Sequence, residues 1–227
     1  MSVFKIEDLC YSYDNGKKLV LDNINYEFEK GKTYAIMGKS GTGKTTLLSL
    51  MSGLDVPRSG KILYNDINIA KINENKYRSN HVGVVFQSLN LLPHLTALEN
   101  VEPSIDISDI KIKNKREHAL KMLAKVGLDE TLANKRVLRL SGGEQQRVAI
   151  ARTLSYNPDV ILADEPTGNL DAVNEKQVLD IFKDLAKTDN KCVIIVTHSE
   201  NISNEVDTVY NLEHHVKKSK DKEEVNK

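Results

Sequence analysis

The chain contains 227 residues, of which 40% are apolar and 28% are charged, a composition typical of a folded globular domain with a sizeable core. Lys and Arg total 32, Asp and Glu also total 32, and the formal net charge is therefore zero. This balance gives no support to binding nucleic acid or an anionic membrane through bulk charge, and we expect no nucleic-acid partner.

The cysteines favour a reducing compartment, and the N-terminus and the apolar runs predict neither a signal peptide nor a membrane span. Cys10 and Cys192 lie far apart in apolar stretches, so we expect both to be small core residues in a reducing cytoplasm. The N-terminus lacks the pattern of a signal peptide. The strongest apolar runs, 160–163 and 193–196, fall far below the ~20 residues that a span needs. If the protein works at a membrane, we expect a separate membrane subunit to hold it there.

The first part of the chain has the pattern of an α/β domain. Apolar and β-branched patterning predicts five strands before residue 87, the fourth being either a strand or a hairpin. In chain order they lie at 3–9, 19–28, 33–37, 61–69 and 82–86. A leucine-rich helix is predicted over 45–53, where Gly53 ends it.

From about Leu89 the pattern favours helices, and after about residue 156 strands return. The helices are predicted at 95–101, 115–126, 130–134 and 143–154. Strands at 160–163, 191–197 and 208–212 and a helix at 175–187 complete the series. We therefore predict one domain over 1–213, with a helical subdomain of about 89–156 inserted in the α/β core. The charged segment 214–227 has little to bury and is predicted to be a solvated tail.

A glycine-rich segment follows the third predicted strand. Residues 38–45 read GKSGTGKT, which fits G-x-x-x-x-G-K-[ST] with a strand before it and a helix after it. Glycines let backbone N–H groups turn toward phosphate oxygens, and the helix adds its positive end. In such a loop Lys44 reaches the β- and γ-phosphates and the Thr45 hydroxyl ligates Mg²⁺. We predict a magnesium–nucleoside triphosphate site here; the alternative is a chance glycine-rich turn. The loop alone does not identify the class of nucleoside triphosphatase.

Polar side chains follow three other predicted strands. Asp164 and Glu165 end the strand 160–163; Asp164 can bind the metal, and Glu165 can accept a proton from an attacking water. His198 and Gln87 follow two further strands. Ligands of parallel α/β sheets collect at the carboxyl ends of strands, so we expect these side chains to meet there. Taken singly, each is equally explained as a solvated strand end.

A second glycine-rich helix start lies at 140–147, which reads LSGGEQQR. Ser141 is placed as an N-cap, and the free helix end suits an anion. The segment has no lysine, so it cannot form a second phosphate loop. Taken alone, it is also explained as an ordinary capped helix.

With this segment the chain resembles the ATP-binding cassette (ABC) ATPases over about residues 1–212, with the motifs in the family's order and spacing. The resemblance implies a RecA-like mixed sheet core, an antiparallel β subdomain and an α-helical subdomain. It implies catalytic roles for Gln87, Glu165 and His198, metal ligation by Thr45, Gln87 and Asp164, and a D-loop at 169–171. The nucleotide-binding residues it implies are Tyr13, Gly38, Lys39, Ser40, Gly41, Thr42, Gly43, Lys44, Thr45, Thr46, Ser141, Gly142 and Gly143.

The resemblance also implies partners. ATP is expected to bind between the loop 38–45 of one subunit and 141–143 of a second cassette, most simply in a homodimer. Residues 86–101 are most similar to cassettes of the MacB, LolD and FtsE group, which serve separate membrane permeases. We thus expect the ATPase subunit of an exporter or efflux system for a peptide, lipoprotein or antibiotic, cytoplasmic and peripheral at the inner face of the cell membrane.

Two other classes remain open at this point. One is an FtsE-like ATPase that transmits force or signals in cell division without transport. The other is a nucleic-acid or repair ATPase, although the chain lacks the long coiled-coil or zinc-module insertions of those relatives. Departures from the group's pattern at 136–139 and 211–215 leave the substrate and the membrane partner undetermined.

Overall fold

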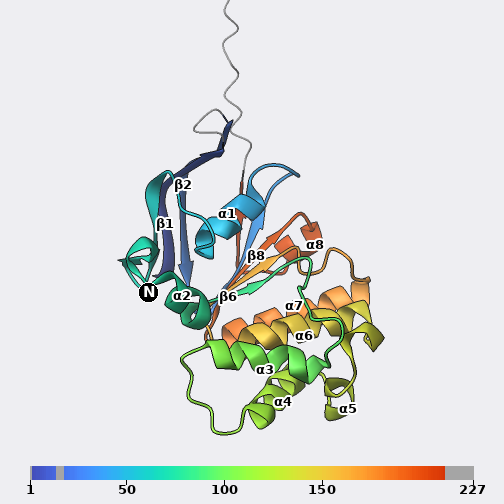
Figure 1. Cartoon of the computed structure of the whole chain (residues 1–227). Helices are drawn as coiled ribbons and strands as arrows, with labels where there is room; N and C mark the ends of the chain where they lie inside the picture. The colour runs from blue at the N-terminus through green and yellow to red at the C-terminus, as the bar shows by residue number, and fades with distance from the viewer. Residues whose placement is uncertain (1, 14–17, 213–227) are drawn as a thin grey trace, which may run out of the picture.

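The computed structural model describes residues 2–13 and 18–212, so the predicted tail 214–227 lies outside the described residues. Two sheets form the frame (Figure 1). The antiparallel sheet has the order β2-β1-β4-β5, with β1 Ser2–Tyr13, β2 Lys18–Glu29, β4 Ser59–Tyr64 and β5 Ile67–Asn68. The second sheet has the order β6-β7-β8-β3-β9, with β3 Thr33–Met37, β6 Val82–Val85, β7 Val160–Asp164, β8 Cys192–Thr197 and β9 Thr208–Asn211. All four of its strand pairs are parallel.

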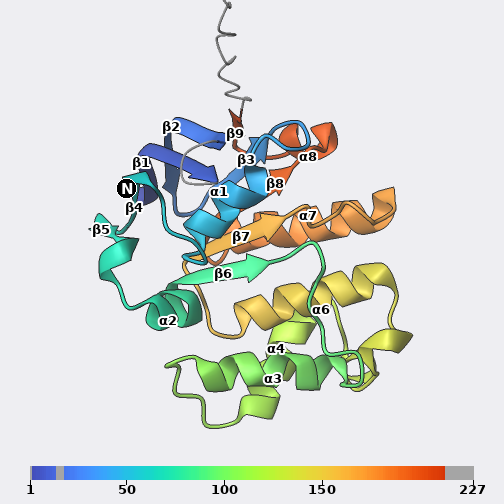
Figure 2. The same ribbon diagram turned by 45° about the horizontal axis from the view of Figure 1, so that its top comes forward.

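The helices complete the mixed α/β fold that the sequence predicted. They are α1 Lys44–Met51, α2 Glu74–Lys76, α3 Ala97–Ile107, α4 Lys115–Lys125, α5 Glu130–Ala133, α6 Gly142–Leu154, α7 Ala172–Lys187 and α8 Glu200–Ser203. In Figure 2, α1 and the antiparallel sheet lie on one side of the parallel sheet, and α7, α6 and α3 follow one another on the other side. None of the helices in the described part of the chain is both long and apolar enough to cross a membrane.

The two central strands β7 and β8 hold the layers together. Their side chains alternate between faces, as the period of a strand requires. Val160 and Leu162 join the core beneath α1 and the antiparallel sheet. Ile161 and Ala163 instead join the core formed with the helices. Every residue of both strands is buried. Each fully buried Val, Leu or Ile side chain contributes about 1.5–3 kcal/mol to the free energy of folding, so the strands that carry the site are held firmly in place.

The structure decides between two alternatives at 61–69 and corrects other element predictions. Of the strand or hairpin predicted at 61–69, the hairpin is present, turned by Asn65 and Asp66 in left-handed conformation. The helix predicted to end at residue 101 continues through Pro103 to residue 107, because buried Val101 and Ile105 anchor both sides of the proline. The short helices α2 and α8 carry too few apolar repeats to be predicted. Cys192 is buried as expected, whereas Cys10 is only half-buried.

Candidate functional site

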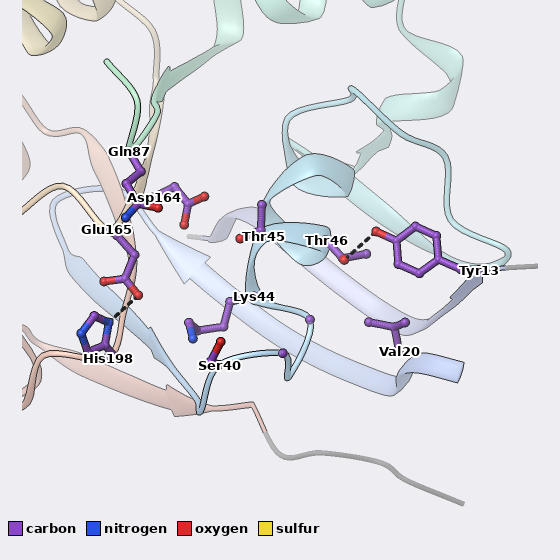
Figure 3. Close-up of a pocket in the computed structure, with 12 residues that line it drawn as sticks. Tyr13, Val20, Ser40, Lys44, Thr45, Thr46, Gln87, Asp164, Glu165 and His198 are labelled. Carbon is purple, nitrogen blue, oxygen red and sulfur yellow. Dashed lines mark hydrogen bonds and ion pairs between the residues drawn. The ribbon is translucent and has the colours of Figure 1, made fainter. Parts of the chain in front are cut away.

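The strand order explains how the predicted site residues meet. Strands β6, β7, β8 and β3 are neighbours in that order, and all four are parallel. Their carboxyl ends therefore bring together Gln87, Asp164, Glu165, His198 and the loop that precedes α1. These elements and the edge of the antiparallel sheet enclose a cavity of about 630 Å³ (Figure 3). Its lining residues are Tyr13, Val20, Ser40, Gly41, Gly43, Lys44, Thr45, Thr46, Gln87, Asp164, Glu165 and His198.

The glycine-rich loop is held by its own side chains. The Lys44 ammonium donates to the carbonyls of Gly38 at 2.7 Å and Lys39 at 3.2 Å. Thr42 is buried and donates its hydroxyl to the Lys39 carbonyl at 2.9 Å, so this predicted nucleotide contact turns into the loop rather than into the cavity. Gly43 has a φ of 97°, and a Cβ there would lie 2.7 Å from Val20, so only glycine fits.

Asp164 and Thr45 face the cavity from β7 and α1 and present a carboxylate and a hydroxyl. Burial and the neighbouring Glu165 carboxylate raise the pKa of Asp164, while Thr45 and the Lys44 ammonium partly oppose that rise. A carboxylate in this environment is stabilised by a bound cation. Mg²⁺ uses one or two protein oxygens together with phosphate and water oxygens, so these residues fit a magnesium–nucleotide.

Glu165 is fixed by two hydrogen bonds at the end of β7. The Thr197 hydroxyl donates to its Oε2 at 3.1 Å, and His198 Nδ1 lies 2.8 Å from its Oε1. Its backbone is left-handed, with a φ of 43°, and its N–H donates to the Val196 carbonyl at 2.8 Å. Its side chain is about 13% exposed and that of His198 is 72% exposed, so the pair lies at the rim of the cavity.

The far end of the cavity carries an aromatic and an aliphatic side chain. Tyr13 is 45% exposed, and its hydroxyl lies 3.0 Å from the Thr46 hydroxyl. Val20 from β2 lies beside it, across the loop from the carboxylates (Figure 3). Val20 was missed by sequence reasoning because a valine within an alternating strand carries no motif. The only sign of its role is that Gly43, which packs against Val20, has no side chain. That contact cannot be seen in the sequence, because the two residues are neighbours only in the folded chain.

The segment 141–143 does not contribute to this cavity in the part of the chain that the structure describes. Ser141 caps α6: its hydroxyl accepts from the Glu144 N–H, and the Glu144 carboxylate accepts from the Ser141 N–H at 2.7 Å. That backbone hydrogen bond holds the pKa of Glu144 below its usual value. Ser141 and Gly142 are exposed, so the helix end is open to an external group.

The chain is similar in sequence to known proteins over most of its length. Residues 21–168 match the ABC transporter family. The chain is 49% identical over 203 residues to the ABC transporter ATP-binding protein YclH of Bacillus subtilis, covering 89% of this chain and 90% of that protein. It is 43% identical to the lipoprotein-releasing system ATP-binding protein LolD of Legionella pneumophila, covering 89% and 91%.

The fold is also similar to that of a solved ATP-binding cassette. The chain matches the dimeric structure of a post-hydrolysis state of the ATP-binding cassette MJ0796 bound to ADP and Pi, with a TM-score of 0.83 and 36% identity. The match covers 93% of this chain and 94% of that one. The MJ0796 protein is from Methanocaldococcus jannaschii.

Proposed function

The chain belongs to the ABC transporter family as an ATP-binding and ATP-hydrolysing subunit, and on that premise we propose how its residues divide the work. Its relatives LolD, MJ0796 and YclH belong to the MacB, LolD and FtsE-like group. The observation that carries the proposal is the convergence of four strand ends on one cavity, with a lysine loop, a buried carboxylate and a fixed glutamate facing one space.

Lys44 and the loop 38–43 bind the phosphates, and Tyr13 and Val20 receive the base at the far end of the cavity. The Thr45 hydroxyl, Asp164 and Gln87 hold Mg²⁺, which neutralises phosphate charge when it is bound. These assignments are supported by the residue types and by their common cavity. The other predicted nucleotide-binding residues around Lys44 and Thr45 shape the loop or line the cavity beside it. They are Gly38, Lys39, Ser40, Gly41, Thr42, Gly43 and Thr46.

Glu165 accepts the proton of the attacking water, and His198 orients that carboxylate and faces the terminal phosphate. Hydrogen bonds from Thr197 and His198 fix the Glu165 carboxylate. A general base held in place in this way needs little reorganisation during the reaction.

The second half of the site comes from another cassette, most simply a second copy of this chain. Ser141, Gly142 and Gly143 do not line the chain's own cavity, yet Ser141 and Gly142 stand exposed at the start of α6. A helix N-terminus attracts phosphate. We propose that this end closes over the ATP of the partner, and that each copy completes the other's site.

A permease at the inner face of the cell membrane would use the energy of this closure. A smaller cavity of about 320 Å³ lies beside the segment after Gln87, and Phe86, Asn90 and Ser104 are among its lining residues. Arg152 from α6 fixes the segment by donating to the carbonyls of Leu89 and Asn90, both at 2.6 Å. We propose that the permease contacts this surface and exports a peptide, lipoprotein or antibiotic.

Glu165→Gln tests the proposal, with Lys44→Ala as its matched control. Glu165→Gln should bind ATP and form a stable dimer while turnover falls by roughly 100-fold, because only the base is lost. Lys44→Ala should weaken ATP binding roughly 10-fold or more, because the charged phosphate donor is lost. The measurements are ATP affinity, sedimentation and phosphate release. Wild-type turnover in Glu165→Gln would contradict the assignment of the base.

The same Glu165→Gln chain tests the permease. Purified with ATP from detergent-solubilised membranes of its own cells, it should retain an integral membrane protein. Stable ATP-regulated activity without any membrane partner would contradict the transport role.

A further inference from the structure

The two glycines at the start of α6 have different surroundings. A Cβ built on Gly142 would meet only Leu170 Cδ2, at 4.0 Å, among the described residues, so the chain itself leaves space there. A Cβ on Gly143 would lie 2.2 Å from Asn174 Oδ1 and 2.6 Å from Asn174 Cγ. Distances this short force one group to move. Within this chain, a side chain at position 143 therefore displaces Asn174, whereas one at position 142 has room.

The obstructing side chain cannot turn aside without losing hydrogen bonds. Asn174 Nδ2 donates to both carboxylate oxygens of Asp171, at 3.0 and 2.9 Å. The Asn174 N–H also donates to Asp171 Oδ1 at 2.8 Å, which makes Asp171 the N-cap of α7. The same interactions hold the pKa of Asp171 below its usual value. Asn174 is thus fixed to the loop before α7 and packed against the start of α6.

A second contact follows one turn further along both helices. Arg147, four residues after Gly143, donates to the side-chain oxygen of Gln177 at 2.9 Å. Gln177 lies three residues after Asn174, so both contacts lie on facing sides of α6 and α7. The two helices run side by side in both views (Figures 1 and 2). The start of α6 and the start of α7 are therefore joined at two successive turns.

We propose that Asn174 is a positioning residue that fixes the start of α6 to the Asp171 loop, so that 141–143 and 169–171 approach the second cassette as one rigid surface. Gly143 is needed to admit Asn174, independently of any ligand. The functional part of this inference rests on the proposed role of 141–143 in the partner's site. The packing part stands on the contacts of the single chain.

A thermal-unfolding cycle without nucleotide tests the packing. Gly143→Ala should lower Tm by roughly 5 °C in the wild type, because the new methyl displaces Asn174. In an Asn174→Ala background the same change should lower Tm by less than about 2 °C, because only the Cβ of residue 174, at 3.1 Å, still lies close to the new methyl. Gly142→Ala, the matched control, should have the same effect in both backgrounds. An equal loss from Gly143→Ala in both backgrounds would overturn the inference.

ATP-dependent dimerisation tests the positioning role. In the Glu165→Gln chain, Asn174→Ala and the equally sized Asn174→Asp should each raise the ATP concentration for half-maximal dimer about 10-fold, with unchanged ATP affinity of the monomer. Asn174→Asp fills the same space but replaces the two donors to Asp171 with a repelling carboxylate. Dimerisation at the parent's ATP concentration in both variants would refute positioning. Failure of the Glu165→Gln parent itself to dimerise would instead refute the proposed function.

Discussion

Thr197 shows how one buried hydroxyl can organise the residues around the proposed base. It is 1% exposed at the end of β8. Its hydroxyl donates to Glu165 Oε2 and accepts from the Ser199 N–H, both at 3.1 Å. The left-handed backbone at Glu165 requires support from its surroundings, since L-residues rarely adopt it. Thr197 supplies part of that support.

We predict that Thr197→Val reduces turnover about 10-fold and leaves ATP affinity unchanged, because valine keeps the shape but frees the Glu165 carboxylate. Thr197→Ser restores the hydroxyl and should recover most of the turnover. The two parameters are measured by steady-state hydrolysis and by ATP binding. Equal turnover in the valine variant and the wild type would show that the hydroxyl does not position Glu165.

At the scale of elements, the edge strand β9 is tied to β3 through one carboxylate. Asp207 Oδ2 accepts from the Thr33 N–H at 2.8 Å and from the Thr33 hydroxyl at 2.7 Å. The backbone donor is the main reason that the pKa of Asp207 lies below its usual value. A carboxyl whose pKa is lower in the folded than in the unfolded chain stabilises the fold above the unfolded value. That contribution is lost as the pH falls through the folded pKa.

Asp207→Asn should therefore lower Tm by about 2–4 °C at pH 7, and its difference from the wild type should shrink as the pH falls below about 4. The Tm of both proteins is measured by thermal unfolding at several pH values between about 3 and 7. Asp180→Asn, on an exposed turn of α7, is the control and should give a small difference at every pH. A constant Asp207→Asn deficit across this range would contradict the role of the ionised carboxylate.

Much of the fold and of the candidate site could be predicted because their signals are local. The strand 33–37 has the predicted bounds, and the residues that end β6, β7 and β8 meet as expected from a parallel sheet. Val20, Thr197 and Asn174 could not be predicted. Each acts through a partner distant in sequence, namely Gly43, Glu165 and Gly143 respectively. Nothing in their own neighbourhoods distinguishes them from ordinary strand or helix residues.

At the scale of the whole molecule, the site depends on how the two sheets are joined. Tyr210 of β9 stacks on Tyr26 of β2, with ring centroids 4.2 Å apart, and its hydroxyl donates to the Glu27 carbonyl at 2.8 Å. This contact joins the parallel sheet to the antiparallel sheet. The antiparallel sheet in turn brings Tyr13 and Val20 to the loop. The chain therefore builds one end of the cavity with each sheet, and leaves the start of α6 facing outward.

The central claim is that each cavity is completed by 141–143 of a second copy. Lys44→Ala disables the phosphate loop and Gly142→Asp disables the helix end with an anion, and neither variant should hydrolyse ATP alone. Half of the dimers in an equal mixture contain both chains, and each such dimer has one intact composite site. The mixture should regain about a quarter of wild-type turnover, measured by phosphate release. A mixture as inactive as its two components would contradict the claim.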